Sequence, residues 1–386
     1  MWRAIASNAV TLLAVILFLM GGVILWGRGE FKEPGPLAQA ICLKVDSGSN
    51  FARVSNNLEE EGAISSAAIF RMGADYSEKS QLLKAGSFLI TPKSSMSEIV
   101  DAVTKGGAST CGTEVVYRVG IARVQAQVRE LDPQTNDFVE KVEFVIGDDA
   151  VPEAYTEVKE AADTRYRIAF AEGVTSWQIV SALNALDVLS EDITDIPAEG
   201  ALAPASYEVR KGQSRADILA QMQEAQEELV AAAWAARDPS VPLNSPEELI
   251  TLASIIEKET GVASERSTVS SVFINRLNQG MRLQTDPTVI YGITRGRGVL
   301  GRGLRRSELR AETPWNTYVI EGLPPTPIAN PGRESLMAAG QPDESEFVFF
   351  VADGTGGHAF AKTLDEHNRN VARWREIEAE RANSNN

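Results

Sequence analysis

The sequence predicts an α+β protein that begins with a single transmembrane helix, continues through small strand–helix units and ends in a mixed α/β domain. Three observations lead to this prediction. An uncharged apolar run opens the chain, two later stretches repeat one strand–turn–helix pattern, and the C-terminal third combines well-capped helices with short apolar strands. At about 150 residues per domain, a chain of 386 residues has room for two or three domains.

The apolar run predicts a membrane anchor. No charged residue occurs from Ala4 to Gly27, and a helix of that length crosses a hydrocarbon core of about 30 Å. Trp2 and Trp26 stand near its ends, where interfacial aromatic residues are expected. The alternative is a cleaved signal peptide, whose apolar region is shorter, about 7–15 residues, and the small-residue pattern at 38–40 comes well after Trp26. We expect an uncleaved anchor with a short cytoplasmic N-terminus and the rest of the chain outside the cytoplasm.

Charge and cysteine content exclude several functions. The formal net charge of −16 argues against binding to nucleic acid or to an anionic membrane surface. Two cysteines cannot make a disulfide-rich scaffold or a four-cysteine zinc site. Cys42 and Cys111 either pair across one segment or remain as unpaired buried cysteines. His358 and His367 lack a metal-ligand spacing, and no nucleophile elbow, phosphate loop or dinucleotide fingerprint occurs, so neither a metal nor a cofactor is expected.

Two stretches beyond the anchor follow one order of elements: strand, turn, helix, spacer, strand, turn, helix. Capping boxes at Ser95 and Thr175 mark helix starts in both. Between the stretches lies a strand-rich insertion for which the sequence suggests no function. The predicted segments are a cytoplasmic N-terminus (1–8), the anchor (9–27), a linker (28–40), the first unit (41–111), the insertion (112–164), the second unit with a connecting helix (165–240), the C-terminal domain (241–378) and a tail (379–386).

One helix of the C-terminal domain carries candidate acid–base chemistry. Ser245 is a good N-cap, Pro246 fits the first helical position and Gly261 is a natural stop, which predicts about four turns. Glu257 lies in the last turn, where the helix dipole and apolar neighbours would raise the pKa of its carboxyl, as a general acid requires. The alternative is a surface glutamate paired with a neighbour. Glu259 lies about 200° further around the helix, so at most one of the two carboxylates lines a given cleft.

A second group of polar residues follows. Gln284, Thr285 and Thr288 offer neutral hydrogen-bonding groups suited to sugar hydroxyls and amides, and Asp286 lies among them. The plain structural interpretation is strong for Asp286, because Asp286 followed by a proline is a typical helix N-cap. Rigid proline and glycine turns further on are able to fix Asn316 and Tyr318 around a pocket.

Arginine is concentrated after the candidate helix. Between residues 261 and 310, nine arginines and no lysine stand against three acidic residues, a local balance of +6 in a chain of −16. Such a block is either a basic loop beside a site for an anionic polymer or a solvated loop that pairs with the protein's own acidic groups. The arginines are Arg266, Arg276, Arg282, Arg295, Arg297, Arg302, Arg305, Arg306 and Arg310.

Several runs between 245 and 371 form a specific combination, namely 252–260, 271–277, 283–292, 315–318, 322–332 and 350–354. In this order they resemble the endolytic murein transglycosylases of the YceG-like family. The anchor and the first unit are also similar to that family, whose N-terminal unit is described as LysM-like. The insertion is longer and more divergent, so the resemblance implies nothing about it.

The resemblance implies a lytic transglycosylase that cleaves the bond between N-acetylmuramic acid and N-acetylglucosamine within peptidoglycan strands. Glu257 matches the family's catalytic glutamate. Its carboxylic acid would protonate the bridging oxygen, and the carboxylate would then take the proton of the muramyl C6 hydroxyl, which attacks C1 and leaves a 1,6-anhydromuramyl end. Ordinary hydrolysis needs two carboxyl groups, so the separation of Glu257 from Glu259 favours transglycosylation. The substrate-binding candidates are Gln284, Thr285, Asp286, Asn316 and Tyr318.

The same resemblance implies a single-pass protein of the inner membrane with a periplasmic catalytic domain. Its expected partners are glycan strands and the penicillin-binding-protein synthases, near which it would end or release nascent strands. The arginine block would then meet the carboxylates of peptide stems. The competing interpretation is a non-catalytic, membrane-anchored glycan-binding scaffold for the synthases. A glycoside hydrolase is a third possibility, and it would leave reducing ends.

Overall fold

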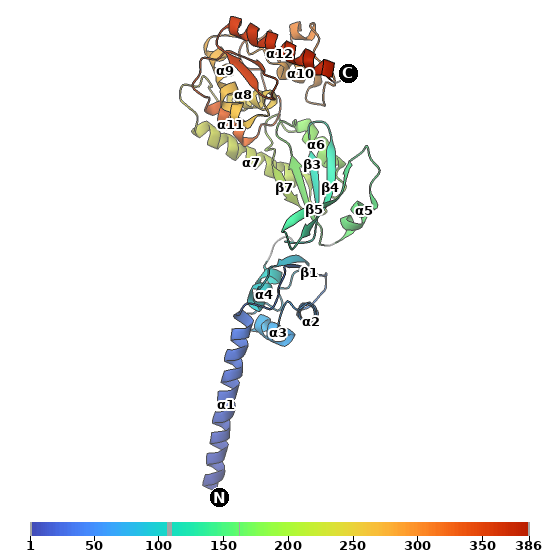
Figure 1. The fold of residues 1–386 in the computed structure, drawn as a ribbon, viewed down its shortest axis with the longest axis vertical. Coiled ribbons are helices and arrows are strands. Elements are labelled where there is room, and N and C mark those ends of the chain that lie inside the picture. Colours follow the sequence, from blue (N-terminus) through green and yellow to red (C-terminus); the bar gives the residue numbers. More distant parts are fainter. Residues whose placement is uncertain (1, 106–109, 162, 385–386) are drawn as a thin grey trace. The chain divides into compact units, whose positions relative to one another are not determined.

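The computed structural model describes residues 2–105, 110–161 and 163–384 (Figure 1). Residue 1 of the predicted N-terminal segment, 106–109 of the first unit, 162 of the insertion and 385–386 of the tail lie outside the described residues. The chain divides into two compact units. The first comprises Met1–Val116, Gln127–Phe144 and Ala150–Tyr166, and the second comprises Tyr117–Ala126, Val145–Asp149 and Arg167–Asn386.

The first unit begins with the long helix α1 (Trp2–Lys32). Among the described residues, the part Thr11–Lys32 is the one helix long and apolar enough to cross a membrane. Its side chains from Leu12 onward are largely exposed to solvent, as expected of a helix whose apolar surface needs a lipid environment. The helix continues to Lys32, so the first residues of the predicted linker are helical.

Residues 41–105 of the first unit form a small α/β layer. Strand β1 (Ile41–Val45) pairs antiparallel with β2 (Gly86–Ile90), with Ile41 opposite Ile90. Helices α2 (Phe51–Glu60), α3 (Ala67–Tyr76) and α4 (Met96–Thr104) supply most of its buried core. The capping box at Ser95 is confirmed, because the Ser95 hydroxyl and the Glu98 carboxylate each accept a backbone N–H of the other residue.

Cys42 and Cys111 form a disulfide, with their Cα atoms 5.6 Å apart. The structure therefore settles the alternative that the sequence left open, in favour of pairing. The bond joins β1 to the segment that follows α4, so it ties together the two ends of the segment 41–111.

A five-stranded sheet has the order β5-β4-β3-β6-β7. The predicted insertion supplies three of its strands and a helix that the sequence did not predict, α5 (Glu153–Glu160). The predicted second unit supplies β6 and β7, so the two segments share one sheet rather than forming a repeat of the first unit. The strands are β3 (Thr113–Val119), β4 (Val124–Asp132), β5 (Asp137–Val145), β6 (Arg165–Phe170) and β7 (Ser206–Val209).

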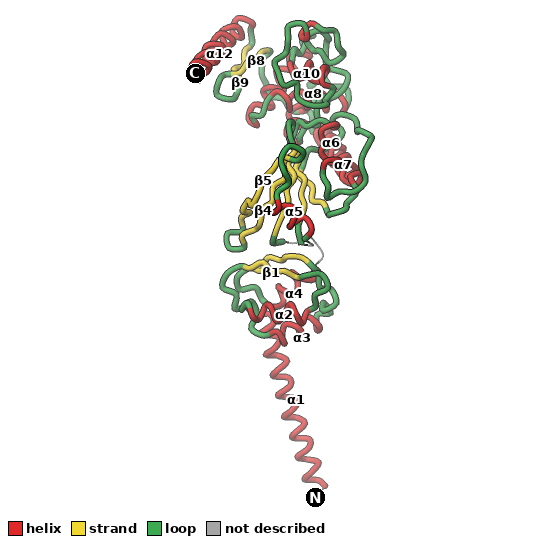
Figure 2. The backbone as a smooth tube through the Cα atoms, turned by 90° about the vertical axis from the view of Figure 1, so that its right-hand side faces the viewer, coloured by secondary structure: helices red, strands yellow, loops and turns green. Residues whose placement is uncertain are grey.

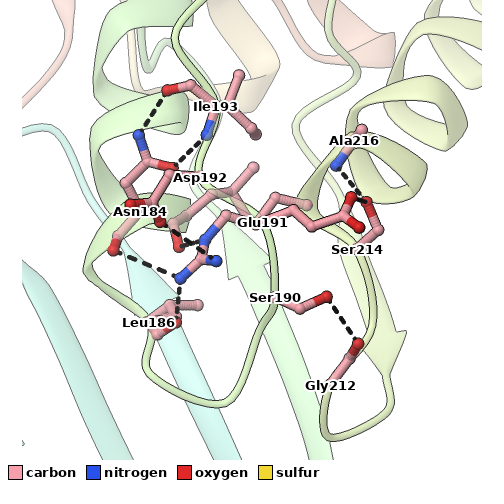
Figure 3. Close-up of polar contacts among 11 residues, drawn as sticks. Asn184, Leu186, Ser190, Glu191, Asp192, Ile193, Gly212, Ser214 and Ala216 are labelled. Atoms are coloured by element: carbon pink, nitrogen blue, oxygen red, sulfur yellow. Dashed lines mark hydrogen bonds and ion pairs between the residues drawn. The ribbon is translucent and has the colours of Figure 1, made fainter.

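In the second unit, α6 (Ser176–Ala185) follows β6 and α7 (Arg215–Ala235) follows β7. The loop after α6 is pinned at the end of that helix (Figure 3). The Asn184 amide donates to the carbonyl of Ile193 at 2.8 Å and accepts the N–H of the same residue at 3.0 Å. Arg215 donates to two carbonyl oxygens at the end of α6, each at 2.7 Å. These bonds satisfy carbonyl groups that a helix end leaves without partners.

The C-terminal part of the second unit is built around the buried helix α8. Leu249, Leu252, Ala253 and Ile256 are fully buried, as the predicted apolar stripe requires, and α8 packs against α7, α9 and α11. Figure 2 shows the hairpin β8–β9 with α12 alongside it. The elements are α8 (Pro246–Glu259), η1 (Ala263–Glu265), α9 (Arg266–Asn278), α10 (Asp286–Thr294), η2 (Glu308–Arg310), α11 (Arg333–Gly340), β8 (Phe349–Ala352), β9 (His358–Ala361) and α12 (Leu364–Ser384).

Candidate active site

The C-terminal end of α8 presents three charged side chains in succession. The helix starts as predicted, because the Ser245 hydroxyl accepts the N–H of Glu248 and Pro246 occupies the first turn. It ends at Glu259. Each of Glu257, Lys258 and Glu259 contacts a different segment of the second unit, so this short charged run is not a solvated surface.

Glu257 belongs to a compact ion network. Its Oε2 accepts the backbone N–H of Gly332 at 2.9 Å, and its Oε1 lies 3.8 Å from Nη2 of Arg266. The Glu257 side chain is only 6% exposed. The same Arg266 nitrogen lies 3.4 Å from Glu172. Both contacts hold the Glu257 carboxyl group in one position.

The loop at Gly332 fits this network closely. A Cβ atom at Gly332 would collide with the carboxylate of Glu172, so a larger residue there would require the Glu172 side chain to move. Burial and the nearby charge of Glu257 raise the pKa of Glu172. The network therefore holds two carboxylates close together, with Arg266 as the cation between them.

Lys258 and Glu199 form a second buried group. The ammonium of Lys258 donates to the carbonyl of Gly173 at 3.2 Å, and burial lowers the pKa of Lys258. Burial raises the pKa of Glu199 to about 7. Glu199 accepts the N–H of Ser176 at 2.8 Å and the hydroxyl proton of Tyr291 at 3.2 Å. Sequence reasoning missed Glu199, because it lies in a loop with no motif around it.

Glu259 has a different environment from Glu257. The Thr285 hydroxyl donates to Oε1 of Glu259, and burial raises the pKa of Glu259 to about 7. The charges of Asp286, His358 and Arg276 also act on this carboxyl, with Asp286 raising its pKa and the other two lowering it. The residue is nevertheless partly exposed. Glu259 is thus a carboxyl group that both holds and releases a proton near neutral pH.

Asp286 and Tyr318 form a pair beside Glu259. The Tyr318 hydroxyl donates to Oδ1 of Asp286 at 2.7 Å, and burial raises the pKa of Tyr318. Asp286 is the first residue of α10, and the N-cap position belongs to Thr285, which makes no side-chain capping bond. The N-cap interpretation of Asp286 is therefore wrong, and its carboxylate is instead the acceptor for a phenol.

Gln284 and Thr285 are held by the turn opposite them. The backbone N–H of Gln284 donates to the Thr317 carbonyl at 3.1 Å, and the N–H of Thr285 donates to the Thr317 hydroxyl at 3.0 Å. Gln284 has a positive φ of 52°, a conformation that turns the chain into α10. Its side-chain oxygen accepts a bond of 3.4 Å from Arg276.

The Asn316 side chain stabilises the turn that carries Tyr318 and is not exposed at a surface. That side chain is fully buried, and its amide nitrogen donates to three carbonyls, including that of Ala311 at 2.7 Å. Its Oδ1 accepts the N–H of Tyr318 at 3.0 Å. A direct sugar contact is therefore not open to Asn316, and its side chain instead fixes the backbone that carries Tyr318.

The structure brings three of the predicted residues to one carboxyl, and that carboxyl is Glu259. Thr285 contacts it directly, Asp286 acts on its charge, and Tyr318 is bound to Asp286. The Gln284 side chain instead contacts Arg276. No contact joins Glu257 to these residues in the part of the chain that the structure describes. Within the same residues, no cluster of His, Cys, Asp or Glu is arranged to hold a metal ion.

Several arginines of the basic block are already bound by the protein. Arg276 donates to the carbonyl of Val348 at 2.7 Å and to that of Leu283 at 2.8 Å. Arg302 pairs with Glu308 at 2.6 Å. The guanidinium of Arg295 lies 4.0 Å from the ring centroid of Trp315. Together with Arg266, these residues support the interpretation that part of the block serves the fold.

Comparisons with known proteins agree on one family. The sequence profile of the YceG-like family matches residues 43–143 and 145–373. A Bacillus subtilis (strain 168) protein named endolytic murein transglycosylase is 27% identical over 352 residues, covering 91% of this chain and 89% of that protein. A Streptococcus pneumoniae protein of the same name is 24% identical over 357 residues. The match covers 86% of this chain and 58% of that protein. A solved yceG-like protein from Listeria monocytogenes is 26% identical, with a TM-score of 0.46. The match covers 86% of this chain and 99% of the Listeria chain. Because the profile spans most of its length, the chain belongs to the YceG-like family.

Proposed function

We propose that this protein is a peptidoglycan lytic transglycosylase that cuts within glycan strands. Its membership in the YceG-like family and its similarity to proteins named endolytic murein transglycosylase support this activity. The observation that carries the proposal is the carboxyl of Glu259, with a pKa of about 7, beside the Asp286–Tyr318 pair. A group of this pKa is suited to act as an acid and then as a base in one reaction.

In the proposed reaction, the Glu259 carboxylic acid gives its proton to the oxygen that bridges N-acetylmuramic acid and N-acetylglucosamine. The bond from C1 to that oxygen breaks, and the departing sugar keeps the proton as a new hydroxyl. The Glu259 carboxylate then takes the proton of the muramyl C6 hydroxyl, whose oxygen bonds to C1. The enzyme returns to its starting protonation state and no water is consumed, so one carboxyl group suffices.

This assignment differs from the one that the sequence suggested, which named Glu257. Two features favour Glu259. Burial raises its pKa to about 7, and the predicted substrate-binding residues Thr285, Asp286 and Tyr318 lie around it. Glu257 is instead committed to the Gly332 N–H and lies close to Arg266. We assign Glu257 the role of fixing the 329–332 loop against the end of α8.

The neighbouring groups have separate roles in this proposal. Tyr318 and Asp286 would bind sugar hydroxyl or amide groups next to the broken bond, and Gln284 would line the approach to it. Thr285 would orient the Glu259 carboxyl, and Asn316 would hold Tyr318 in place. Arginines of the basic block would meet the carboxylates of peptide stems.

Location and partners complete the proposal. We assign α1 as a single-pass anchor in the inner membrane, with the N-terminus inside and the residues that follow α1 on the periplasmic side, because peptidoglycan lies outside the cytoplasm. The first unit would be a LysM-like glycan-binding module, which its paired short strands and intervening helices support. Anchored near the synthases, the enzyme would end or release nascent strands.

A digestion assay separates this function from its competitors. The full-length protein, in detergent, is incubated with purified glycan strands, and the products are analysed by mass spectrometry. The proposal predicts internal cleavage and 1,6-anhydromuramyl ends. Reducing ends would identify a glycoside hydrolase instead. Binding to the strands without any cleavage would support the non-catalytic scaffold.

A further inference from the structure

The first unit carries an exposed apolar strip on helix α3. Met72 is 61% exposed and Tyr76 is 79% exposed. With Ala68, which is also exposed, they are spaced four residues apart and therefore lie on one face of the helix. The opposite face of α3 is buried in the core of the unit through Phe70 and Ala74. The exposed strip thus lies on the side of α3 that the protein's own core does not cover.

Helix α3 packs against the end of α1. Both Figure 1 and Figure 2 show α3 beside the C-terminal end of α1. The ring of Phe31 lies so close to Gly73 that a Cβ atom there would collide with it. One turn nearer the apolar part of α1, the guanidinium of Arg28 lies 5.7 Å from the centroid of the Tyr76 ring.

These two contacts fix the direction of α3 relative to α1. Gly73 lies at the level of Phe31 and Tyr76 at the level of Arg28, so α3 runs back toward the apolar part of α1. Arg28 comes two residues after Trp26, a distance of about 3 Å along a helix axis. Tyr76 is therefore at the depth where the apolar run ends.

We propose that the Tyr76 end of this strip, with Met72 one turn behind it, contacts the lipid bilayer. Tyrosine is favoured at the boundary between headgroups and acyl chains, and the apolar side chain of Met72 gains from burial beside it. Tyr76 lies level with the end of the apolar run of α1, so this end of the strip meets the same membrane surface. It would hold the first unit directly on the membrane. This inference rests on the assignment of α1 as the membrane anchor.

The charges near the strip indicate which lipid chemistry it needs. Arg28 and the acidic residues Asp75 and Glu78 lie around Tyr76, while Lys79 is paired with Asp101. The signs are mixed, and the whole chain is acidic. The contact is therefore apolar and interfacial, and it needs no anionic headgroup.

Site-directed spin labelling of the full-length chain tests the contact. Single cysteines replace Ala68, Met72 or Tyr76, and the native Cys42 and Cys111 remain paired as a disulfide. Control labels replace Asn57, which is exposed on α2, and Val15, which is 49% exposed on α1. The protein is reconstituted in phosphatidylcholine vesicles, and collision rates with oxygen and with a water-soluble nickel chelate are measured.

The proposal predicts a gradient along α3. Nickel collisions at position 76 should be lower than at position 57 by about threefold or more, as expected at a membrane interface. They should rise through position 72 to position 68, while oxygen collisions follow the opposite order. Nickel collisions equal to those of the Asn57 label at all three positions would overturn the proposal. Protection from both reagents would also overturn it, because protein rather than lipid would then cover the strip. A Val15 label accessible to nickel would show that the anchor assignment itself had failed.

Discussion

The hydroxyl of Thr285 donates a hydrogen bond to the carboxyl group of Glu259. This bond joins the end of α8 to the turn before α10, two segments separated by the whole of α9. It also favours the ionised form of Glu259 and so opposes the effect of burial, which raises the pKa of that group to about 7. Thr285 thus sets both the position and the acidity of the proposed acid.

Replacing Thr285 with valine should shift the pH dependence of cleavage. The hydrogen bond lowers the pKa of Glu259, so its loss should raise that pKa further. Because the reaction starts from the protonated acid, the fall of kcat/KM on the alkaline side should move to higher pH. Serine at this position retains the hydroxyl and should keep the native profile. The measurement is the rate of anhydro-end formation between pH 5 and 9. An unchanged alkaline limb in Thr285→Val would mean that Thr285 does not act on the proposed acid.

The buried Glu199 should make stability depend on pH. Its folded-state pKa of about 7 lies above the ordinary value of 4.5, so the folded state binds a proton more tightly than the unfolded chain does. The stability contribution of the bound proton is therefore fully present below about pH 4.5 and is lost as pH rises through 7. Glu259 contributes in the same direction.

Replacing Glu199 with glutamine should flatten this dependence. The native protein should lose thermal stability between pH 5 and pH 8, and Glu199→Gln should lose less of its Tm over that range. Glu334→Gln, at an exposed position, serves as the control and should follow the native curve. Parallel curves for Glu199→Gln and the native protein would contradict the assigned proton uptake.

The Tyr318 hydroxyl should matter more for activity than for folding. Tyr318→Phe removes the donor to Asp286 without changing the size of the ring, so we expect a loss of cleavage rate of about tenfold with a small change in Tm. Asn316→Ala removes a fully buried side chain that donates to three carbonyls, and should lower stability by about 1–3 kcal/mol. Denaturation curves and initial rates for both variants provide the comparison. Equal stability losses in the two would remove the distinction between the site residue and its support.

The fit of Gly332 against Glu172 predicts a coupled pair of substitutions. Gly332→Ala places a methyl group into the Glu172 carboxylate and should displace the N–H that binds Glu257. Activity and Tm should both fall. Adding Glu172→Ala removes the obstacle and should restore part of both quantities. A double-mutant cycle measures this coupling, and strictly additive effects would show that the loop is not held in the described way.

The sequence predicted a large part of this fold because local signals were strong. The capping boxes at Ser95 and Thr175 and the Ser245–Pro246 start are all found at the predicted positions. The strands of the insertion were only partly predicted, and the two apparent repeats proved to have different sheet arrangements. Strand neighbours far apart in the sequence depend on side-chain packing that periodicity alone does not specify.

The candidate site was likewise predicted only in part from the sequence. The residue types and the opposite directions of the two glutamates followed from the Glu-Lys-Glu run and the helical period. The choice between Glu257 and Glu259 depended on contacts with Gly332 and Thr285, which lie far along the chain. Glu199 and the Asp286–Tyr318 pair could not be found from sequence spacing, because the turns that bring them together carry no signal of their own.

Paired substitution of the two glutamates shows which of them is the catalytic acid. Glu259→Gln and Glu257→Gln are each assayed on purified glycan strands, with anhydromuropeptide release measured by mass spectrometry and folding checked by thermal denaturation. The account predicts that Glu259→Gln folds normally but releases no anhydro product, and that Glu257→Gln retains measurable turnover with reduced stability. Full activity in Glu259→Gln, together with complete loss in a folded Glu257→Gln, would contradict it and return the catalytic role to Glu257.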